Sequence, residues 1–209
     1  MTLVGLPIND FVKRLADGSP TPGGGSVAAL AGSLGAALCA MVSRITLAKE
    51  KYKDAWEKME RVRDSADQLA RRLLELADRD TEAYNQVVAA FRLPKKDGAQ
   101  EAARSHAIQE ATKRAALIPM ETLREVARLV DLVGEALDKG NPNCITDAGV
   151  AVQLVRAAAM GAAYNVRINL SDVMDKGFTS RLETEVTELV AQITKSADRI
   201  SEAVERALG

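Results

Sequence analysis

Apolar side chains recur at steps of three and four residues over most of the chain, the spacing that places them on one face of an α-helix. The longest such segment runs from Asp54 to Phe91, and at ~1.5 Å per residue a helix of that length measures roughly 55 Å. A second long seam runs from Phe178 to Leu208. Seams with this mixed spacing are typical of helices that cross at shallow angles, so the pattern predicts long helices packed side by side.

Prolines, glycines and capping residues divide the chain into a series of predicted helices. Their approximate bounds are 8–15, 26–46, 54–91, 100–117, 119–139, 146–170 and 178–208. Ser26 is expected to cap the second helix and Thr146 or Asp147 the sixth, whereas Pro119 suits the first turn of the fifth. The sequence shows no strand pattern and no internal repeat. The predicted fold is therefore all-α, a bundle of long antiparallel helices that forms a single domain over residues 1–209.

Composition agrees with this fold, since hydrophobic residues make up 47% of the chain and aromatic residues only 3%. The formal net charge is -1 with both signs interspersed, which excludes the basic stripe that a nucleic-acid partner requires. Cys39 and Cys144 form no disulfide framework and no secretory leader is visible, so the cytoplasm is the expected compartment. The apolar stretch from Val27 to Val42 is shorter than the ~20 residues that span a bilayer, so a buried helix is expected there and no membrane partner.

Asp80 interrupts the apolar seam of the third predicted helix, between Leu76 and Ala83. A carboxylate on such a seam must find a partner, face a pocket or change its pKa. The sequence leaves two interpretations open. One is a structural pair with an arginine or a helix end, and the other is an acid-base group in a pocket.

Asp147 opens the sixth predicted helix, and Asn165 and Asn169 follow on nearly the same face beyond a run of small residues. These side chains either line a narrow groove or serve as an N-cap and as polar contacts between packed helices. Asp147 and Asn165 lie ~27 Å apart along the helix axis, too far to act on one reacting atom. They would touch opposite ends of a long ligand or belong to different sites in an oligomer.

Two further segments carry candidate chemistry. The glycines at 23–25 and Ser26 open the second predicted helix, where free N–H groups suit a carboxylate or phosphate, although the run lacks the features of the nucleotide-binding motifs. Lys51 and Tyr52 lie in a lysine-rich turn, which is either a solvated helix end or the source of one lysine for a cleft. His106 is the only histidine and is expected on the surface, so proton transfer falls mainly to Asp, Glu, Lys or Tyr.

Four motifs carry a resemblance to one family. They are PTPGGGSVAAL at 20–30, MVSRITLAKEKY at 41–52, LPK at 93–95 and GNPNCITDAGVA at 140–151. In these motifs, and over almost its whole length, the chain resembles the family of stand-alone methenyltetrahydrofolate cyclohydrolases and of the cyclodeaminase domain of formiminotransferase-cyclodeaminase. The family's Gly-Lys-Lys-Lys-Tyr stretch reads Ala-Lys-Glu-Lys-Tyr here, so Glu50 departs from the pattern.

The resemblance implies an all-helical homodimer that acts on a tetrahydrofolate substrate and uses no metal and no further cofactor. It suggests Asp80 or Asp147 as the base or charge-stabilising group and Lys51 as the acid. The substrate-binding residues that it suggests are Gly24, Gly25, Ser26, Tyr52, Asn141, Asn143, Asn165 and Asn169.

Two reactions fit this family. One is the hydrolytic opening of 5,10-methenyltetrahydrofolate to 10-formyltetrahydrofolate, and the other is the cyclisation of formiminotetrahydrofolate with release of ammonia. The sequence has no formiminotransferase segment, which favours the cyclohydrolase. The alternative from another class is a non-catalytic helical interaction protein, in which the polar seam residues only set the helix register.

Overall fold

The computed structural model describes residues 2–209, and within them it contains helices and no strand. The α-helices are α1 (Ile8–Ala16), α2 (Gly24–Leu47), α3 (Trp56–Phe91), α4 (Gly98–Lys139), α5 (Ile145–Leu170) and α6 (Lys176–Leu208). Short 3-10 helices cover Leu3–Gly5, Glu50–Ala55 and Pro142–Cys144. The predicted all-α class is confirmed.

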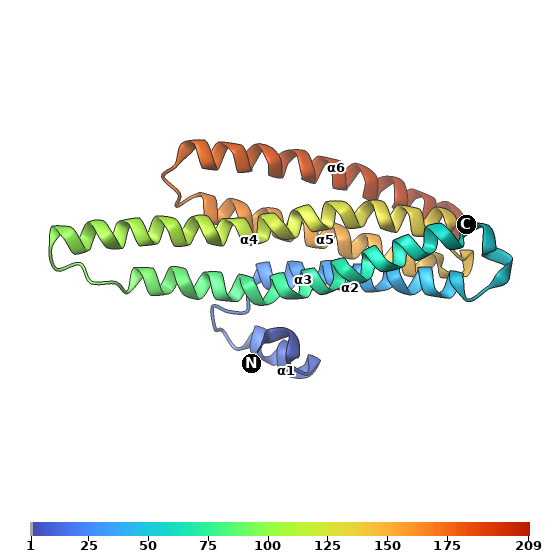
Figure 1. Ribbon diagram of the computed structural model, residues 1–209, viewed down its shortest axis with the longest axis horizontal. Helices are drawn as coiled ribbons and strands as arrows, with labels where there is room; N and C mark the ends of the chain where they lie inside the picture. Colours follow the sequence, from blue (N-terminus) through green and yellow to red (C-terminus); the bar gives the residue numbers. More distant parts are fainter. Residues whose placement is uncertain (1) are drawn as a thin grey trace.

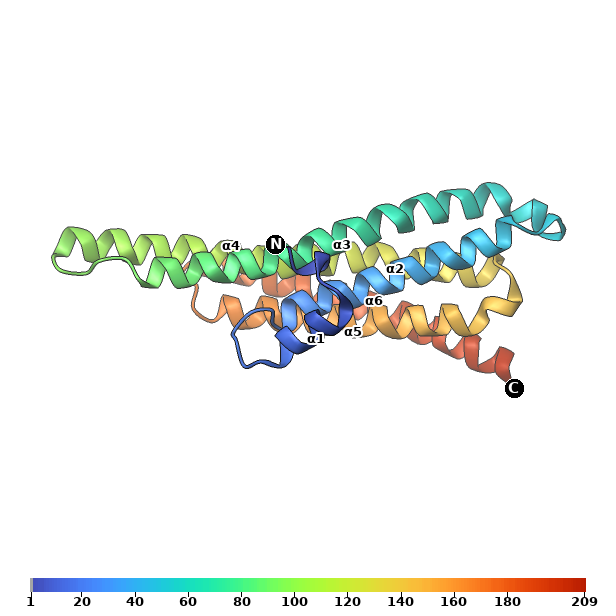
Figure 2. The same cartoon turned by 90° about the horizontal axis from the view of Figure 1, so that it is seen from below.

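Helices α2 to α6 lie side by side as a bundle of long helices that run up and down (Figure 1). The hairpin of α3 and α4 extends beyond the other helices at one end, whereas α1 lies outside the bundle. Figure 2 looks onto α2, which has α3 on one side and α5 on the other. The start of α2 therefore meets the middle of α3 and the end of α5.

Small residues let α2 approach three other helices at once. A Cβ added at Gly32 would lie 3.2 Å from side-chain atoms of both Leu73 in α3 and Val126 in α4. It would also lie 3.5 Å from the Cβ of Ala158 in α5. Larger side chains at this point would push the helices apart and open the close-packed core. The small residues thus determine how near the polar groups of α3 and α5 come to the start of α2.

Helix α4 continues through Pro119, so the predicted break into separate helices at residues 117 and 119 is wrong. A proline inside a helix lacks the N–H that would bond the carbonyl oxygen four residues earlier, here that of Ala115. The side-chain amide of Asn169 in α5 donates to this oxygen instead, at 3.2 Å. Buried side chains on both sides of the proline hold α4 in the core. Tertiary packing therefore overrides the local helix-breaking signal.

Two predicted helix caps are also wrong. Gly23 is the N-cap of α2, and Ser26 lies inside the helix with its side chain fully buried. Helix α5 follows directly on a 3-10 turn with Cys144 at its N-cap, so neither Thr146 nor Asp147 caps it. In both cases the helix begins earlier in the chain than the preferred capping residue, so capping preferences alone did not locate the helix start.

Candidate functional site

A groove opens at the start of α2, where the loop before this helix meets α3, α4 and the end of α5. It encloses about 380 Å³. Its polar lining side chains are those of Thr21, Asp80, Tyr84, Asn165, Asn169 and Asp172, and its apolar ones include Val87 and Ile168. We call it the Asp80 groove.

Asp80 is held in the groove by the first turn of α2. The hydroxyl of Ser26 donates to Oδ2 of Asp80 at 2.9 Å, and the backbone N–H of Ser26 also bonds the carboxylate. Partial burial raises the pKa of Asp80 above its ordinary value, because the charged form loses solvation, while the bonds from Ser26 oppose this rise. The structure thus combines features of the two interpretations of Asp80, because the carboxylate bonds to the end of a helix and also lines a pocket.

The glycine run is explained by the approach of α3 and α5 to the start of α2. A Cβ added at Gly25 would collide with the carboxylate of Asp80, and one at Gly24 would lie 3.4 Å from Nδ2 of Asn165. The anion at this helix start is thus the protein's own carboxylate. Ser26 is 0% exposed and bonds to Asp80, so in this structure its hydroxyl orients the carboxylate.

Asn165 and Asn169 line the groove together with Asp80, and Asn169 also makes a polar contact with α4, so both interpretations that the sequence left open describe part of the arrangement. The amide of Asn165 donates to the carbonyl oxygen of Gly161 at 2.8 Å. The amide of Asn169 donates to two carbonyl oxygens, those of Asn165 at 2.9 Å and Ala115 at 3.2 Å. Both asparagines are therefore anchored to backbone carbonyls, which fixes how their amides face the groove.

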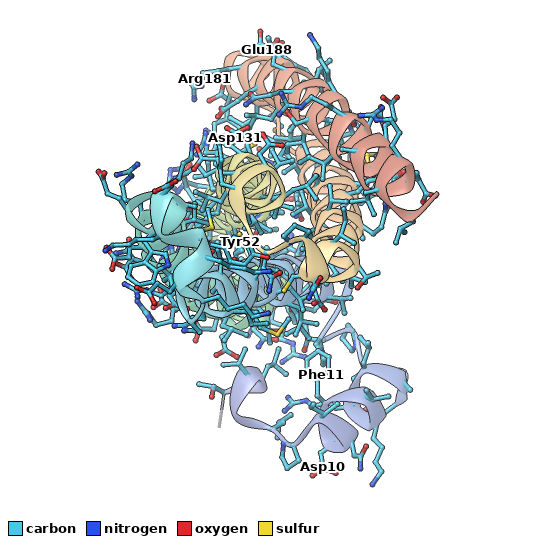
Figure 3. All side chains as sticks on the ribbon, turned by 90° about the vertical axis from the view of Figure 1, so that its right-hand side faces the viewer. Asp10, Phe11, Tyr52, Asp131, Arg181 and Glu188 are labelled. Atoms are coloured by element: carbon cyan, nitrogen blue, oxygen red, sulfur yellow. The ribbon has the colours of Figure 1, made fainter. Side chains whose placement is uncertain are left out.

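A second polar cluster lies at the opposite end of the bundle, which Figure 3 views end-on with Tyr52 labelled. The hydroxyl of Tyr52 donates to Oδ1 of Asn141 at 2.9 Å, and the N–H of Asn143 donates to the same oxygen at 3.1 Å. Asn141 is only 3% exposed, and its backbone N–H donates to Oγ1 of Thr46 at 2.8 Å. We call Lys51, Tyr52, Asn141, Asn143 and Asp147 the Tyr52 cluster.

Lys51 is exposed, and its ammonium group lies 4.7 Å from the centre of the Tyr52 ring. Asp147 lies in the first turn of α5, beside the turn that contains Asn141 and Asn143. These side chains belong to the end of α2 and the start of α5, whereas the Asp80 groove belongs to the start of α2 and the end of α5.

The predicted site residues thus form two groups that one chain does not bring together. The eighteen-residue separation of Asp147 and Asn165 along α5 corresponds to ~27 Å. In the same way, Asp80 lies beside the first turn of α2, whereas Lys51 follows its last turn. The geometry therefore excludes an acid-base pair of Asp80 and Lys51 from the same subunit acting on one reacting atom.

Several groove residues were not among the predicted site residues, and Tyr84, Ile168 and Asp172 are examples. Tyr84 is one helical turn from Asp80 on the same face of α3, so the spacing could have indicated it. Ile168 and Asp172 come from the end of α5 and the turn after it, where no periodic signal points to a groove.

The chain matches the family described as Formiminotransferase-cyclodeaminase over residues 7–188. It is 38% identical over 197 residues to a methenyltetrahydrofolate cyclohydrolase of Methylorubrum extorquens, covering 94% of this chain and 95% of that protein. It is 33% identical over 202 residues to a formimidoyltransferase-cyclodeaminase of Gallus gallus, covering 97% of this chain and 37% of that protein.

A solved structure of similar fold is that of formiminotetrahydrofolate cyclodeaminase from Thermotoga maritima, with a TM-score of 0.89 and 29% sequence identity. The alignment covers 99% of this chain and 100% of that one. The helical bundle described above is thus shared over its full length.

Proposed function

The chain belongs to the formiminotransferase-cyclodeaminase family, and we propose that it is an enzyme that hydrolyses 5,10-methenyltetrahydrofolate to 10-formyltetrahydrofolate. The cyclohydrolase of Methylorubrum extorquens supports this reaction, because the similarity covers nearly the whole of both chains. The matching proteins are named for enzymes, which argues against the non-catalytic interaction protein.

The observation that carries the proposal is the carboxylate of Asp80, which is partly buried in a groove with its pKa raised. The methenyl bridge of the substrate is cationic, so a nearby carboxylate stabilises it. As water adds to the bridge carbon, Asp80 accepts the water proton. The bond from this carbon to N5 then breaks, N5 takes up a proton, and the carbon stays on N10 as a formyl group. Hydrolysis of one cation by one water releases one proton overall.

The second candidate reaction is the cyclodeaminase reaction, which is favoured by the structural similarity to the Thermotoga maritima protein. It needs the same kind of proton transfer, because ring closure expels ammonia from a formimino group. The two reactions are separated by supplying each substrate to the purified protein. Loss of methenyl absorbance supports the cyclohydrolase, and ammonia release from formiminotetrahydrofolate supports the cyclodeaminase. A protein that is inactive on both substrates contradicts the proposal.

We also propose that the protein is a homodimer, because one face of α2 is apolar and uncovered. The α2 positions that remain accessible include the apolar residues Val27, Leu30, Leu34, Ala37 and Met41, which lie on one side of the helix. The exposed Arg44 at the end of this side forms an ion pair with Asp67 of α3. Leu34, near the middle of this face, is 51% exposed. Helix α2 is long and apolar enough to pass for a membrane span, although 61% of its most apolar window is buried in the bundle. A second copy on this face would cover the remainder.

Exposed apolar side chains also lie on α5 and α1. Val150, Tyr164 and Ile168 are exposed on α5, beside α2. On α1, Ile8 is 82% exposed and Val12 55%, and the two lie one turn apart on the same side of this outlying helix. Such faces are stabilised by burial against another molecule, at about 25 cal/mol per Å² of apolar surface.

A two-fold dimer on this face would complete the site. The Asp80 groove and the Tyr52 cluster lie at opposite ends of α2, so a two-fold axis near Leu34 brings the groove of one subunit towards the Tyr52 cluster of its partner. Lys51 would then be able to protonate the departing nitrogen of a substrate bound beside Asp80. The groups that a single chain keeps apart would act together across the interface.

A further inference from the structure

Pro119 lies on the helix that backs the Asp80 groove, yet the groove is lined by its neighbour Ala115 and not by the proline itself. The carbonyl oxygen of Ala115 has no N–H of residue 119 to accept from, because proline carries none. This oxygen is therefore a free acceptor in the interior of a helix, where such groups are costly to leave unpaired. The amide of Asn169 donates to it at 3.2 Å.

The amide of Asn169 has no hydrogen left for a ligand. One N–H group is directed at Ala115 and the other at the carbonyl oxygen of Asn165, 2.9 Å away. A side-chain amide has two donor hydrogens and one acceptor oxygen, so only Oδ1 of Asn169 remains for a molecule in the groove. The orientation of the amide is determined by these partners, since a carbonyl oxygen would repel Oδ1 in the same place.

We propose that Pro119 is a positioning residue for the groove, which acts by freeing the Ala115 carbonyl to hold Asn169 with its oxygen as the available group. This inference rests on the proposed function of the groove as the folate site. Because Oδ1 of Asn169 is a hydrogen-bond acceptor, it selects a part of the ligand that carries hydrogen-bond donors. The amino and ring N–H groups of a reduced pterin are such donors.

Replacing Pro119 should weaken the hydrogen bonding of the Asn169 side chain while residue 169 itself stays unchanged. In Pro119→Ala, the new N–H of residue 119 competes with the Asn169 amide for the Ala115 carbonyl, which weakens one anchor of this amide. Pro119→Val restores the same N–H with a side chain of nearly the original volume, which controls for a cavity. Both variants should keep or raise the melting temperature, because proline is the least favourable residue in a helix interior.

The kinetic expectation is a selective loss of substrate affinity. We expect KM for the methenyl substrate to rise about three- to tenfold in either Pro119 variant, the equivalent of one weakened hydrogen bond, with kcat changed less. Asn169→Ala should raise KM to a similar extent. Adding Asn169→Ala to Pro119→Ala should raise KM little further, because both changes act on the same contact.

A double-mutant cycle measured by melting temperature uses the same variants and needs no substrate. We call it the thermal cycle. Asn169→Ala alone should lower the melting temperature by about 2–6 °C, because it leaves the Ala115 carbonyl buried and unpaired. In the Pro119→Ala background the same change should cost less than half as much. Additive effects in either the thermal or the kinetic cycle would overturn the role of Pro119. A wild-type protein that turns over no folate would overturn the proposed function, while the thermal cycle would still test how Asn169 is held.

Discussion

The carboxylate of Asp80 lies so close to Gly25 that a side chain at residue 25 would collide with it. This contact joins the middle of α3 to the first turn of α2, and it explains why the glycine run continues to this position. The buried hydroxyl of Ser26, one residue later, bonds the same carboxylate. The geometry of the groove therefore depends on a helix start that has no side chain where the carboxylate passes.

Gly25→Ala should displace Asp80 and impair both activity and stability. Because the added Cβ would overlap the carboxylate that Ser26 holds in place, we expect kcat/KM to fall at least about tenfold, as a 1 Å misplacement can cost far more. Gly24→Ala is the matched control, since its Cβ would meet Asn165 at an ordinary contact distance of 3.4 Å. Steady-state kinetics with the methenyl substrate would measure both, and equal losses would contradict the role of the Asp80 contact.

Ser26→Ala should change the pH dependence of the reaction. The hydroxyl of Ser26 lowers the pKa of Asp80, so its removal should raise this pKa further. A base must be ionised to act, and the acid limb of the kcat profile should therefore move to higher pH. Ser33→Ala is a control from the same helix, because the Ser33 hydroxyl bonds the Ala70 carbonyl, away from the groove. If the acid limb stays in place, Asp80 is not the base.

Asp80→Asn should abolish most activity but stabilise the fold near neutral pH. Burial raises the pKa of Asp80 in the folded state, so the folded protein binds this proton more readily than the unfolded chain. The contribution of Asp80 to stability therefore falls as pH rises from the unfolded pKa through the folded one. The neutral amide avoids this cost. We expect a higher melting temperature than wild type at pH 7, a difference that vanishes in acid, and a rate loss of about 10²–10⁴.

Mixing two inactive variants tests the shared site. Lys51→Met and Asp80→Asn should each be nearly inactive, but a mixed dimer would contain one groove with an intact Asp80 and an intact partner's lysine. Random exchange makes about half of the dimers mixed, so activity should recover to roughly a quarter of wild type. Subunit exchange must first be verified independently. If activity then does not recover, a site that combines the two groups across the interface is excluded.

Leu34→Glu tests the dimer itself. The charge would lie in the middle of the apolar α2 face, where burial without a partner is strongly unfavourable. We expect light scattering to show a monomer at concentrations where the wild type is a dimer, with activity lost together with the dimer. Thr187→Glu, on the exposed surface of α6, should change neither mass nor activity.

The extent of α3 and α6 was readable from the sequence, because each buries one continuous apolar stripe and local periodicity records that burial directly. Asp80 was recognisable for the same reason, as a carboxylate that breaks such a stripe. The family resemblance was also contained in short motifs of the chain. Pro119 was misread because a local rule cannot include the amide that α5 supplies to the Ala115 carbonyl.

The sequence alone thus determined most of the helices and their apolar faces, although it divided α4 at Pro119, and it indicated many of the polar residues in the Asp80 groove and the Tyr52 cluster. Only the tertiary structure decided which of them meet: Asp80 with Ser26 and Asn169 at one end, and Tyr52 with Asn141 at the other. Helix periodicity specifies which side of a helix is buried but not which neighbouring turn it faces. That pairing depends on the close approach allowed by small residues on α2, and it is a property of the packed helices together.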